Sequence, residues 1–259
     1  MELSDFAFFH QGKIVKLLSP QEAHYLAAID QIVTPRQDHA LLLLHGFASS
    51  PAVYRAMLPL ITGYDRIVCP ILPGHAQSIR AFSQCTAQQW RDTTHNACAK
   101  LMNDYAKVSV VGLSLGGSLA LELSQTFRLH HLYLLAPALK LYYPAYLACL
   151  AAQGLRSVGW KTMANHAGDI FSDQFQELVY QRLPISAIIE VLSFIHSQTI
   201  TQPNCPTDLF LGRHDKVIDV QTVAQRYANQ AVQIHWLEQS AHVLPLDTDR
   251  GVLLQAINL

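Results

Sequence analysis

The stretch Gly112-Leu113-Ser114-Leu115-Gly116 stands between a β-branched run and a segment of helix-favouring residues. The run 108–111 predicts a buried strand, and residues 117–123 predict a helix. In such a strand–turn–helix context, Gly-x-Ser-x-Gly is typical of a nucleophile elbow, whose tight turn lifts the serine hydroxyl clear of the sheet. The two glycines lack a Cβ, so strand and helix can approach closely enough to make the turn. Ser114 is therefore the candidate nucleophile.

Composition sets few limits on the fold but argues against some classes of function. With 259 residues, half of them apolar, the chain can form one large domain with a well-covered core. A net charge of −1 at pH 7 gives no indication of a nucleic-acid or anionic-membrane partner. The first 16 residues lack a signal-peptide pattern and no apolar run could span a bilayer, so we expect a cytoplasmic protein without stable membrane insertion. The five scattered cysteines favour reduced thiols.

Strands and helices alternate along most of the chain. Strands are predicted at 40–44, 66–72, 108–111, 131–136, 207–212 and 232–237. Helices are predicted between and after them, at 51–61, 88–103, 117–123 and 220–229 and from about Arg250. Short connections between alternating elements indicate an α/β fold with a mostly parallel central sheet and helices on both faces.

Two regions depart from this alternation. Ser19-Pro20-Gln21-Glu22 has the pattern of a capping box and predicts a helix that runs to about Val33. Between residues 137 and 206 no strand is evident, and helices are expected at 143–154, 173–182 and 186–197. The predicted organisation is an N-terminal extension with one helix, a split α/β core and a helical insertion, comprising residues 1–38, 39–136 with 207–259, and 137–206.

A serine nucleophile requires a base within hydrogen-bond reach and an acid that orients the base. Asp215 follows the strand predicted at 207–212, and His242 follows the strand predicted at 232–237. The carboxyl ends of parallel strands meet at one edge of a sheet, where ligands bind. Asp215 and His242 are therefore the candidate acid and base, in the chain order serine, acid, histidine.

Other residues compete for these roles. Asp208 begins its strand, Asp219 is a natural N-cap for the next helix, and Asp247 follows His242 in the chain. His45 and His75 border the predicted active-site loops, and we expect them to hold loop geometry. Four more histidines show no carboxylate pairing and no metal-ligand spacing in the sequence, and we expect structural or exposed positions for His130, His131, His214 and His235. No metal is therefore predicted.

Five short motifs occur in a consistent order along the chain. They are Leu-Leu-Leu-Leu-His-Gly-Phe at 41–47, Pro-Gly-His at 73–75, Gly-Leu-Ser-Leu-Gly-Gly at 112–117, Gly-Arg-His-Asp at 212–215 and Gln-Ser-Ala-His at 239–242. With these motifs the sequence resembles the α/β-hydrolase family, and within it the small-capped bacterial carboxylesterase and monoacylglycerol lipase-like hydrolases. The resemblance covers most of residues 40–259 and is thinnest in the insertion. Ala76 departs from it, because relatives commonly have a second glycine there.

The resemblance implies an α/β-hydrolase fold with a helical cap inserted after the sixth core strand. It implies Ser114 as nucleophile, Asp215 as orienting carboxylate and His242 as general base and acid. Phe47 and Leu115 match the positions whose backbone N–H groups form the oxyanion hole, a contribution of roughly 3–4 kcal/mol per donor. It also implies that no cofactor is needed.

The insertion is dense in apolar and aromatic side chains, which would either pack it onto the core or line an acyl pocket. They are Leu139, Leu141, Tyr142, Tyr143, Tyr146, Leu147, Leu150, Phe171, Phe175, Leu192 and Phe194. We expect a serine carboxylic-ester hydrolase acting on a small-molecule ester of short to medium acyl chain, with monoacylglycerols among the candidates. The same residues would also suit a thioesterase, an acyltransferase, a carbon–carbon bond hydrolase or a non-catalytic binding protein. The sequence does not indicate the oligomeric state.

Overall fold

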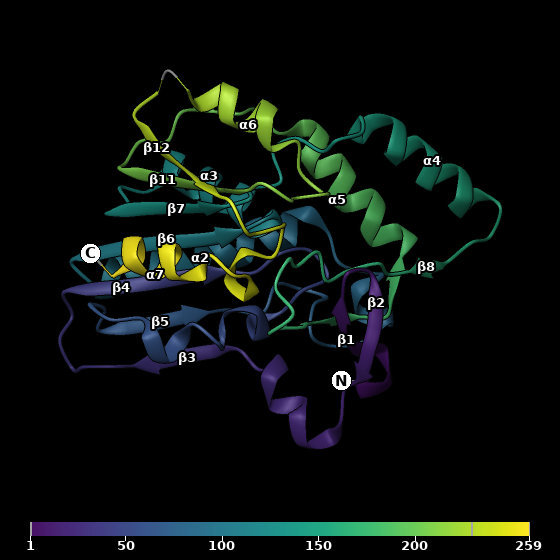
Figure 1. Ribbon diagram of the computed structural model, residues 1–259, viewed down its shortest axis with the longest axis horizontal. Coiled ribbons are helices and arrows are strands. Elements are labelled where there is room, and N and C mark those ends of the chain that lie inside the picture. Colours follow the sequence, from purple (N-terminus) through teal and green to yellow (C-terminus); the bar gives the residue numbers. More distant parts are fainter. Residues whose placement is uncertain (1, 229, 259) are drawn as a thin grey trace.

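The computed structural model describes residues 2–228 and 230–258. Its centre is a seven-stranded sheet with the order β12-β11-β7-β6-β4-β5-β3 (Figure 1). These strands are β3 (Ile29–Ile32), β4 (His39–Leu44), β5 (Arg66–Cys69), β6 (Lys107–Leu113), β7 (His131–Leu135), β11 (Thr207–Gly212) and β12 (Val232–Leu237). Neighbouring strands are parallel except β3 and β5, which are antiparallel. The mostly parallel α/β sheet expected from the sequence is therefore confirmed.

The central strand β4 is buried on both faces of the sheet. Leu42 and Leu44 belong to one apolar cluster, together with Trp90 and Leu119 of the helices that cover that face. Leu41 and Leu43 alternate with them and belong to a second cluster on the opposite face. A strand covered on both faces needs apolar side chains at every position. This explains why residues 40–44 form an unbroken apolar run.

The helices around the sheet agree largely with the prediction. They are α1 (Ile79–Phe82), α2 (Ala87–Asp104), α3 (Leu115–Thr126), α4 (Ala145–Ser157), α5 (Ile185–Ser197), α6 (Val220–Tyr227) and α7 (Arg250–Ile257), with 3₁₀ turns η1 (Leu3–Asp5), η2 (Pro20–Leu26), η3 (Pro51–Tyr54), η4 (Leu58–Leu60) and η5 (Leu244–Leu246). The helix predicted at 51–61 is instead the two turns η3 and η4, because Pro59 cannot donate the hydrogen bond of a helix interior. The predicted end of the helix at Asn229 lies outside the described residues. None of the described helices is long and apolar enough to cross a membrane.

The N-terminal region differs from the prediction of a single helix. β1 (Phe6–His10) and β2 (Lys13–Leu17) form an antiparallel hairpin, which the sequence did not indicate. The Glu22 carboxylate does accept hydrogen bonds from Ser19, but the turn ends at Leu26 instead of Val33. The next residues form β3, because Ile29 becomes buried where the chain pairs with β5 at the edge of the sheet.

The insertion between β7 and β11 also contains strands. Helices α4 and α5 match the prediction, but no helix forms at 173–182. That segment contains β9 (Glu177–Tyr180) and the start of β10 (Arg182–Pro184), which pairs with β8 (Thr162–Ala164). β9 pairs with β1 of the N-terminal hairpin, and a partner so distant in sequence leaves no local pattern.

The insertion and the hairpin gather at one end of the molecule (Figure 1). The chain leaves the main sheet after β7, its fifth strand in chain order, whereas the insertion was expected after the sixth core strand. Because β1 joins β9, the N-terminal residues and the insertion share one small sheet, β2-β1-β9. The extension is thus built into the insertion.

Candidate active site

Ser114 lies at the turn between β6 and α3 in a strained backbone conformation. Its φ of 53° and ψ of −116° are unusual for a residue with a side chain. The Ser114 N–H donates to the carbonyl of Leu135 at 2.9 Å, and its own carbonyl accepts from Gly117 and Ala138. Neighbouring backbone on both sides of the turn therefore holds the strained residue in place.

Two glycines make this turn possible. A Cβ at Gly112 would overlap the carbonyl of Gly116, and a Cβ at Gly116 would overlap the carbonyl of Leu44. The helix thus starts in direct backbone contact with strands β6 and β4. The close approach predicted from the Gly-x-Ser-x-Gly pattern is confirmed.

Asp215 and His242 form a buried pair beyond the carboxyl end of β11. His242 Nδ1 lies 2.8 Å from Asp215 Oδ2, and the Asp215 residue is 4% exposed. The other carboxylate oxygen accepts backbone N–H groups of Val217 and Ile218 at 2.7 and 2.8 Å. Because a carboxylate can only accept, Nδ1 carries the proton and Nε2 is left as the basic nitrogen.

The charge state of His242 depends on several carboxylates. Burial disfavours its charged form, but the charge and hydrogen bond of Asp215, together with the charges of Asp169 and Glu177, outweigh burial, and the pKa of His242 is raised. Asp169 and Glu177, both in the insertion, act in the same direction. A base with a raised pKa accepts a proton more readily, which suits general base chemistry.

The loop after β4 lies against the elbow. A Cβ at Gly46 would be 3.4 Å from the Ser114 Cβ, so the loop backbone passes directly over the serine. In the described chain, the N–H groups of Phe47 and Leu115 donate no hydrogen bond. Leu115 is the first residue of α3, where an N–H has no partner within the helix. These two donors are therefore available for a negatively charged oxygen.

Ser114 itself is only partly buried, and its hydroxyl makes no hydrogen bond to any described residue. Of the three predicted catalytic side chains, the structure joins Asp215 and His242 by a hydrogen bond and leaves Ser114 unbonded to either. Ser114 follows strand β6 and Asp215 follows strand β11, so both residues lie at the carboxyl edge of the parallel sheet.

His45 and His75 hold loops, as the sequence predicted. His45 Nδ1 lies 3.0 Å from the Gly46 carbonyl, and its Nε2 accepts the Leu72 N–H. His75 Nδ1 lies 3.1 Å from the Pro73 carbonyl. Burial lowers the pKa of both, to about 4 for His45 and about 3 for His75, so both imidazoles are neutral near pH 7.

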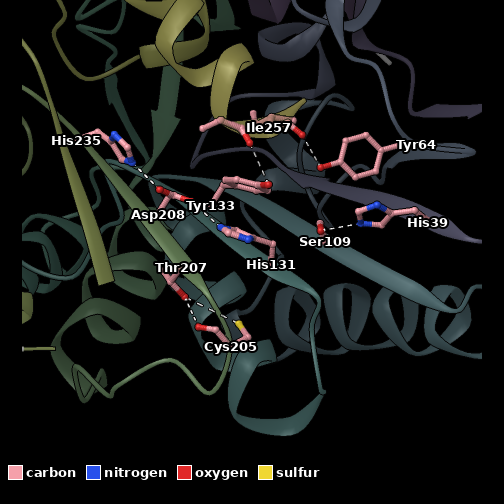
Figure 2. A network of polar contacts seen from close by, with 11 residues as sticks. His39, Tyr64, Ser109, His131, Tyr133, Cys205, Thr207, Asp208, His235 and Ile257 are labelled. Carbon is pink, nitrogen blue, oxygen red and sulfur yellow. Dashed lines mark hydrogen bonds and ion pairs between the residues drawn. The ribbon is translucent and has the colours of Figure 1, made fainter. Parts of the chain in front are cut away.

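The competing aspartates have other partners. Asp208 lies between His131 and His235, whose Nε2 atoms are 2.6 and 2.5 Å from its two oxygens (Figure 2). The prediction that these two histidines lack a carboxylate partner is wrong, because the pairing joins separate strands. Asp219 caps α6 by accepting the Thr222 N–H at 3.0 Å.

Three acidic residues near His242 were not predicted as part of the site. Asp169 and Glu177 come from the insertion, and Asp247 accepts the Ala241 N–H at 2.8 Å. The sequence had offered Asp247 only as a rival acid. Asp169 and Glu177 carried no signal, because neither belongs to a motif in the sequence.

The apolar residues of the insertion divide into two groups. Leu139, Leu141, Leu192 and Phe194 are buried in the core, whereas Tyr143, Tyr146, Leu147 and Leu150 are exposed. A cavity of about 510 Å³ lies between the hairpin, η3 and the insertion, where Phe8, Phe175 and Leu178 line it, and neither Ser114 nor His242 does. Most of the residues expected to line an acyl pocket therefore pack the insertion or face solvent.

Within the described residues, no group of three or more His, Cys, Asp or Glu is arranged to hold a metal ion.

Comparisons with known proteins identify the family and agree with the fold. The profile of the alpha/beta hydrolase family matches residues 41–256. The chain is 26% identical to a thermostable monoacylglycerol lipase of Bacillus sp. (strain H-257), over 83% of this chain and 87% of the relative. It is 22% identical to a carboxylesterase of Bacillus subtilis (strain 168), over 88% and 96% of the two chains. A chain from the solved structures of LipS and LipT, two metagenome-derived lipolytic enzymes, superposes with a TM-score of 0.78 at 23% identity, over 89% and 95% of the two chains.

Proposed function

Because the chain belongs to the alpha/beta hydrolase family, we propose that it is a serine hydrolase that cleaves carboxylic esters. The observation that carries the proposal is the buried Asp215–His242 pair, with a basic Nε2, at the sheet edge where the strained Ser114 turn also lies. The names of the relatives, a monoacylglycerol lipase and a carboxylesterase, support the same reaction class.

The proposed reaction proceeds through an acyl-enzyme. His242 Nε2 takes the proton of Ser114 as the serine oxygen attacks the ester carbonyl. The N–H groups of Phe47 and Leu115 stabilise the negative charge on the tetrahedral intermediate, and Asp215 stabilises the imidazolium that forms. His242 then gives its proton to the leaving alcohol, and a water activated by the same nitrogen releases the acid.

The proposed substrates are esters of short- to medium-chain acids, including monoacylglycerols. Support comes from the relatives' names, and we propose that the insertion, which bonds to the loops of Asp215 and His242, acts as the cap of the active site. A cytoplasmic location completes the proposal and fits the five free cysteines.

Hydrolysis of p-nitrophenyl esters from acetate to palmitate, by the wild type and by Ser114→Ala, tests the proposal. We expect a chain-length optimum in the wild type and a loss of at least about 10⁴-fold in the variant, since the nucleophile is removed. Monoacylglycerols of the preferred chain length are then followed by acid release. A wild type no more active than Ser114→Ala on every ester would overturn the esterase proposal, and thioesters would be tested next.

A further inference from the structure

One short segment of the insertion touches both loops that carry the candidate acid and base. This bridging segment comprises residues 169–172. The carbonyl of Asp169 accepts the N–H groups of His242 and Val243, at 3.0 and 3.1 Å. The carboxylate of the same residue accepts the N–H of Lys216 at 2.9 Å. A single residue thus bonds to the base itself and to the neighbour of the acid.

Asp247 fastens the rest of the bridging segment. Its two carboxylate oxygens accept the N–H groups of Phe171 and Ser172, both at 2.8 Å. The oxygen that binds Phe171 also accepts the N–H of Ala241, next to His242. Asp247 is 1% exposed, so these charged hydrogen bonds are shielded from water. The segment and the histidine loop therefore form one rigid unit.

Glu177 bonds to the residue that precedes the bridging segment. Its residue is 8% exposed, and its Oε2 accepts the Gly168 N–H at 2.9 Å. The N-terminal hairpin supports the same turn, because Gln11 and Gly12 donate N–H groups to the carbonyls of Gly168 and Ala167. The hairpin and Glu177 of β9 thus hold the turn before Asp169, whose carbonyl accepts the His242 N–H.

The charges around His242 are mostly negative. Asp215 contacts it from the loop after β11, and the negative charges of Asp169 and Glu177 act on it from the insertion. Lys216 is the cation near Asp169. Burial raises the pKa of Asp169 and of Glu177, while the charge of His242 lowers both. Each of the two carboxylates and a protonated His242 therefore stabilise one another.

We propose that Asp169, supported by Glu177, is a positioning residue of this hydrolase that holds the acid and base loops together and stabilises the protonated form of His242. The inference rests on the proposed function. When the Ser114 proton moves to His242, the charges of Asp169 and Glu177 stabilise the new positive charge in addition to Asp215. Since the second and third carboxylates belong to the insertion, the insertion supports the chemistry in addition to covering the site.

Asp169→Asn removes the negative charge of this side chain and can keep its hydrogen bonds. An asparagine oxygen can still accept the Lys216 N–H, and the backbone carbonyl that binds His242 is unchanged. Glu177→Gln makes the same change at the second carboxylate. Asp173→Asn is the matched control, because its carboxylate lies next to the bridging segment in the chain but is 94% exposed, 3.6 Å from His10 Nε2.

The readout is the pH profile of kcat/KM on the preferred p-nitrophenyl ester. In Asp169→Asn we expect the acidic limb to move to lower pH by at least about 0.3 unit, a twofold change in the ratio of protonated to neutral His242. On the plateau we expect a roughly 3- to 10-fold loss of kcat with KM within twofold, since a weaker base is less efficient. Glu177→Gln is expected to shift the limb in the same direction, and Asp173→Asn to leave it unchanged.

A titration of the His242 imidazole by NMR, in Ser114→Ala with and without Asp169→Asn, gives a readout independent of turnover. Lower protonation in the double variant is expected. If the titration and the pH profile of Asp169→Asn match those of Asp173→Asn, the inference is overturned while the proposed function stands. If Ser114→Ala retains wild-type activity, the proposed function fails and the titration still decides the inference. Should Asp169→Asn fail to fold, Glu177→Gln carries the same charge test.

Discussion

Two carboxylate–histidine clusters lie at opposite ends of strand β11, and only one belongs to the candidate active site. Asp208 is the second residue of the strand and contacts the imidazoles of His131 and His235 (Figure 2). Asp215 follows the last residue of the strand and contacts His242. The residue types are the same in both clusters, so residue type alone does not decide what a cluster does.

The difference lies in which imidazole nitrogen is occupied. In the Asp208 cluster, both histidines point Nε2 at the carboxylate. In the Asp215 cluster, Nδ1 makes that contact, and Nε2 has no hydrogen-bond partner among the described residues. A histidine held through Nδ1 keeps a basic nitrogen for a substrate or nucleophile. Chemistry at the carboxyl end of β11 therefore depends on the orientation of the His242 ring and on the strained serine that follows β6 at the same edge of the sheet.

The comparison is tested most strongly by changing each aspartate to asparagine. Asp215→Asn is expected to lower kcat by about 10⁴-fold, because the amide favours the wrong tautomer of His242. Asp208→Asn is expected to leave kcat within about twofold of wild type. The measurement is steady-state hydrolysis of the preferred p-nitrophenyl ester at pH 8. Equal losses in the two variants would remove the distinction between the clusters.

The free energy of unfolding, in contrast to activity, is expected to depend on the Asp208 cluster. Asp208→Ala leaves two partly buried imidazoles without their acceptor, which costs about 1–3 kcal/mol of unfolding free energy. The measurement is urea unfolding at pH 7, with Asp173→Ala as a control at an exposed carboxylate. A free energy of unfolding equal to that of the control would show that the Asp208 cluster contributes nothing to the fold.

The smallest expected effect is on the pH dependence of activity. The pKa of His242 is raised, so kcat/KM should fall as pH drops through a midpoint above the ordinary histidine value of about 6.5. The sign follows because only neutral His242 can accept the serine proton. Asp208→Asn should leave this midpoint unchanged, since Asp208 lies at the other end of the strand. A midpoint at or below 6.5 in the wild type would contradict the electrostatic account of the site.

The alternation of strands and helices in the core and the place of the candidate site were predictable from local pattern. The unbroken apolar run of β4 predicts a strand buried on both faces of a sheet, whichever strands pair with it. The Gly-x-Ser-x-Gly motif predicts the tight turn, since the glycines that the turn requires lie within the motif. Asp215 and His242 follow successive strands, so their position at one edge follows from parallel topology.

The N-terminal hairpin and the strands of the insertion could not be predicted in the same way. β1 and β9 pair although about 170 residues separate Ala7 from Val179 in the chain, and each strand is short. Propensity favoured a helix over 173–182, and the distant strand partner decided otherwise. The same long-range pairing places Glu177 behind the bridging segment.

The sequence by itself determined the catalytic candidates Ser114, Asp215 and His242 and the sheet that carries them, because motif, strand and chain order are local properties. Only the tertiary structure decided that Asp208 pairs with His131 and His235. It also decided that Asp169 of the insertion bonds to the backbone of His242. Hydrogen bonds and charges act through space, between residues brought together by folding, so contacts between distant segments leave no pattern in a single chain.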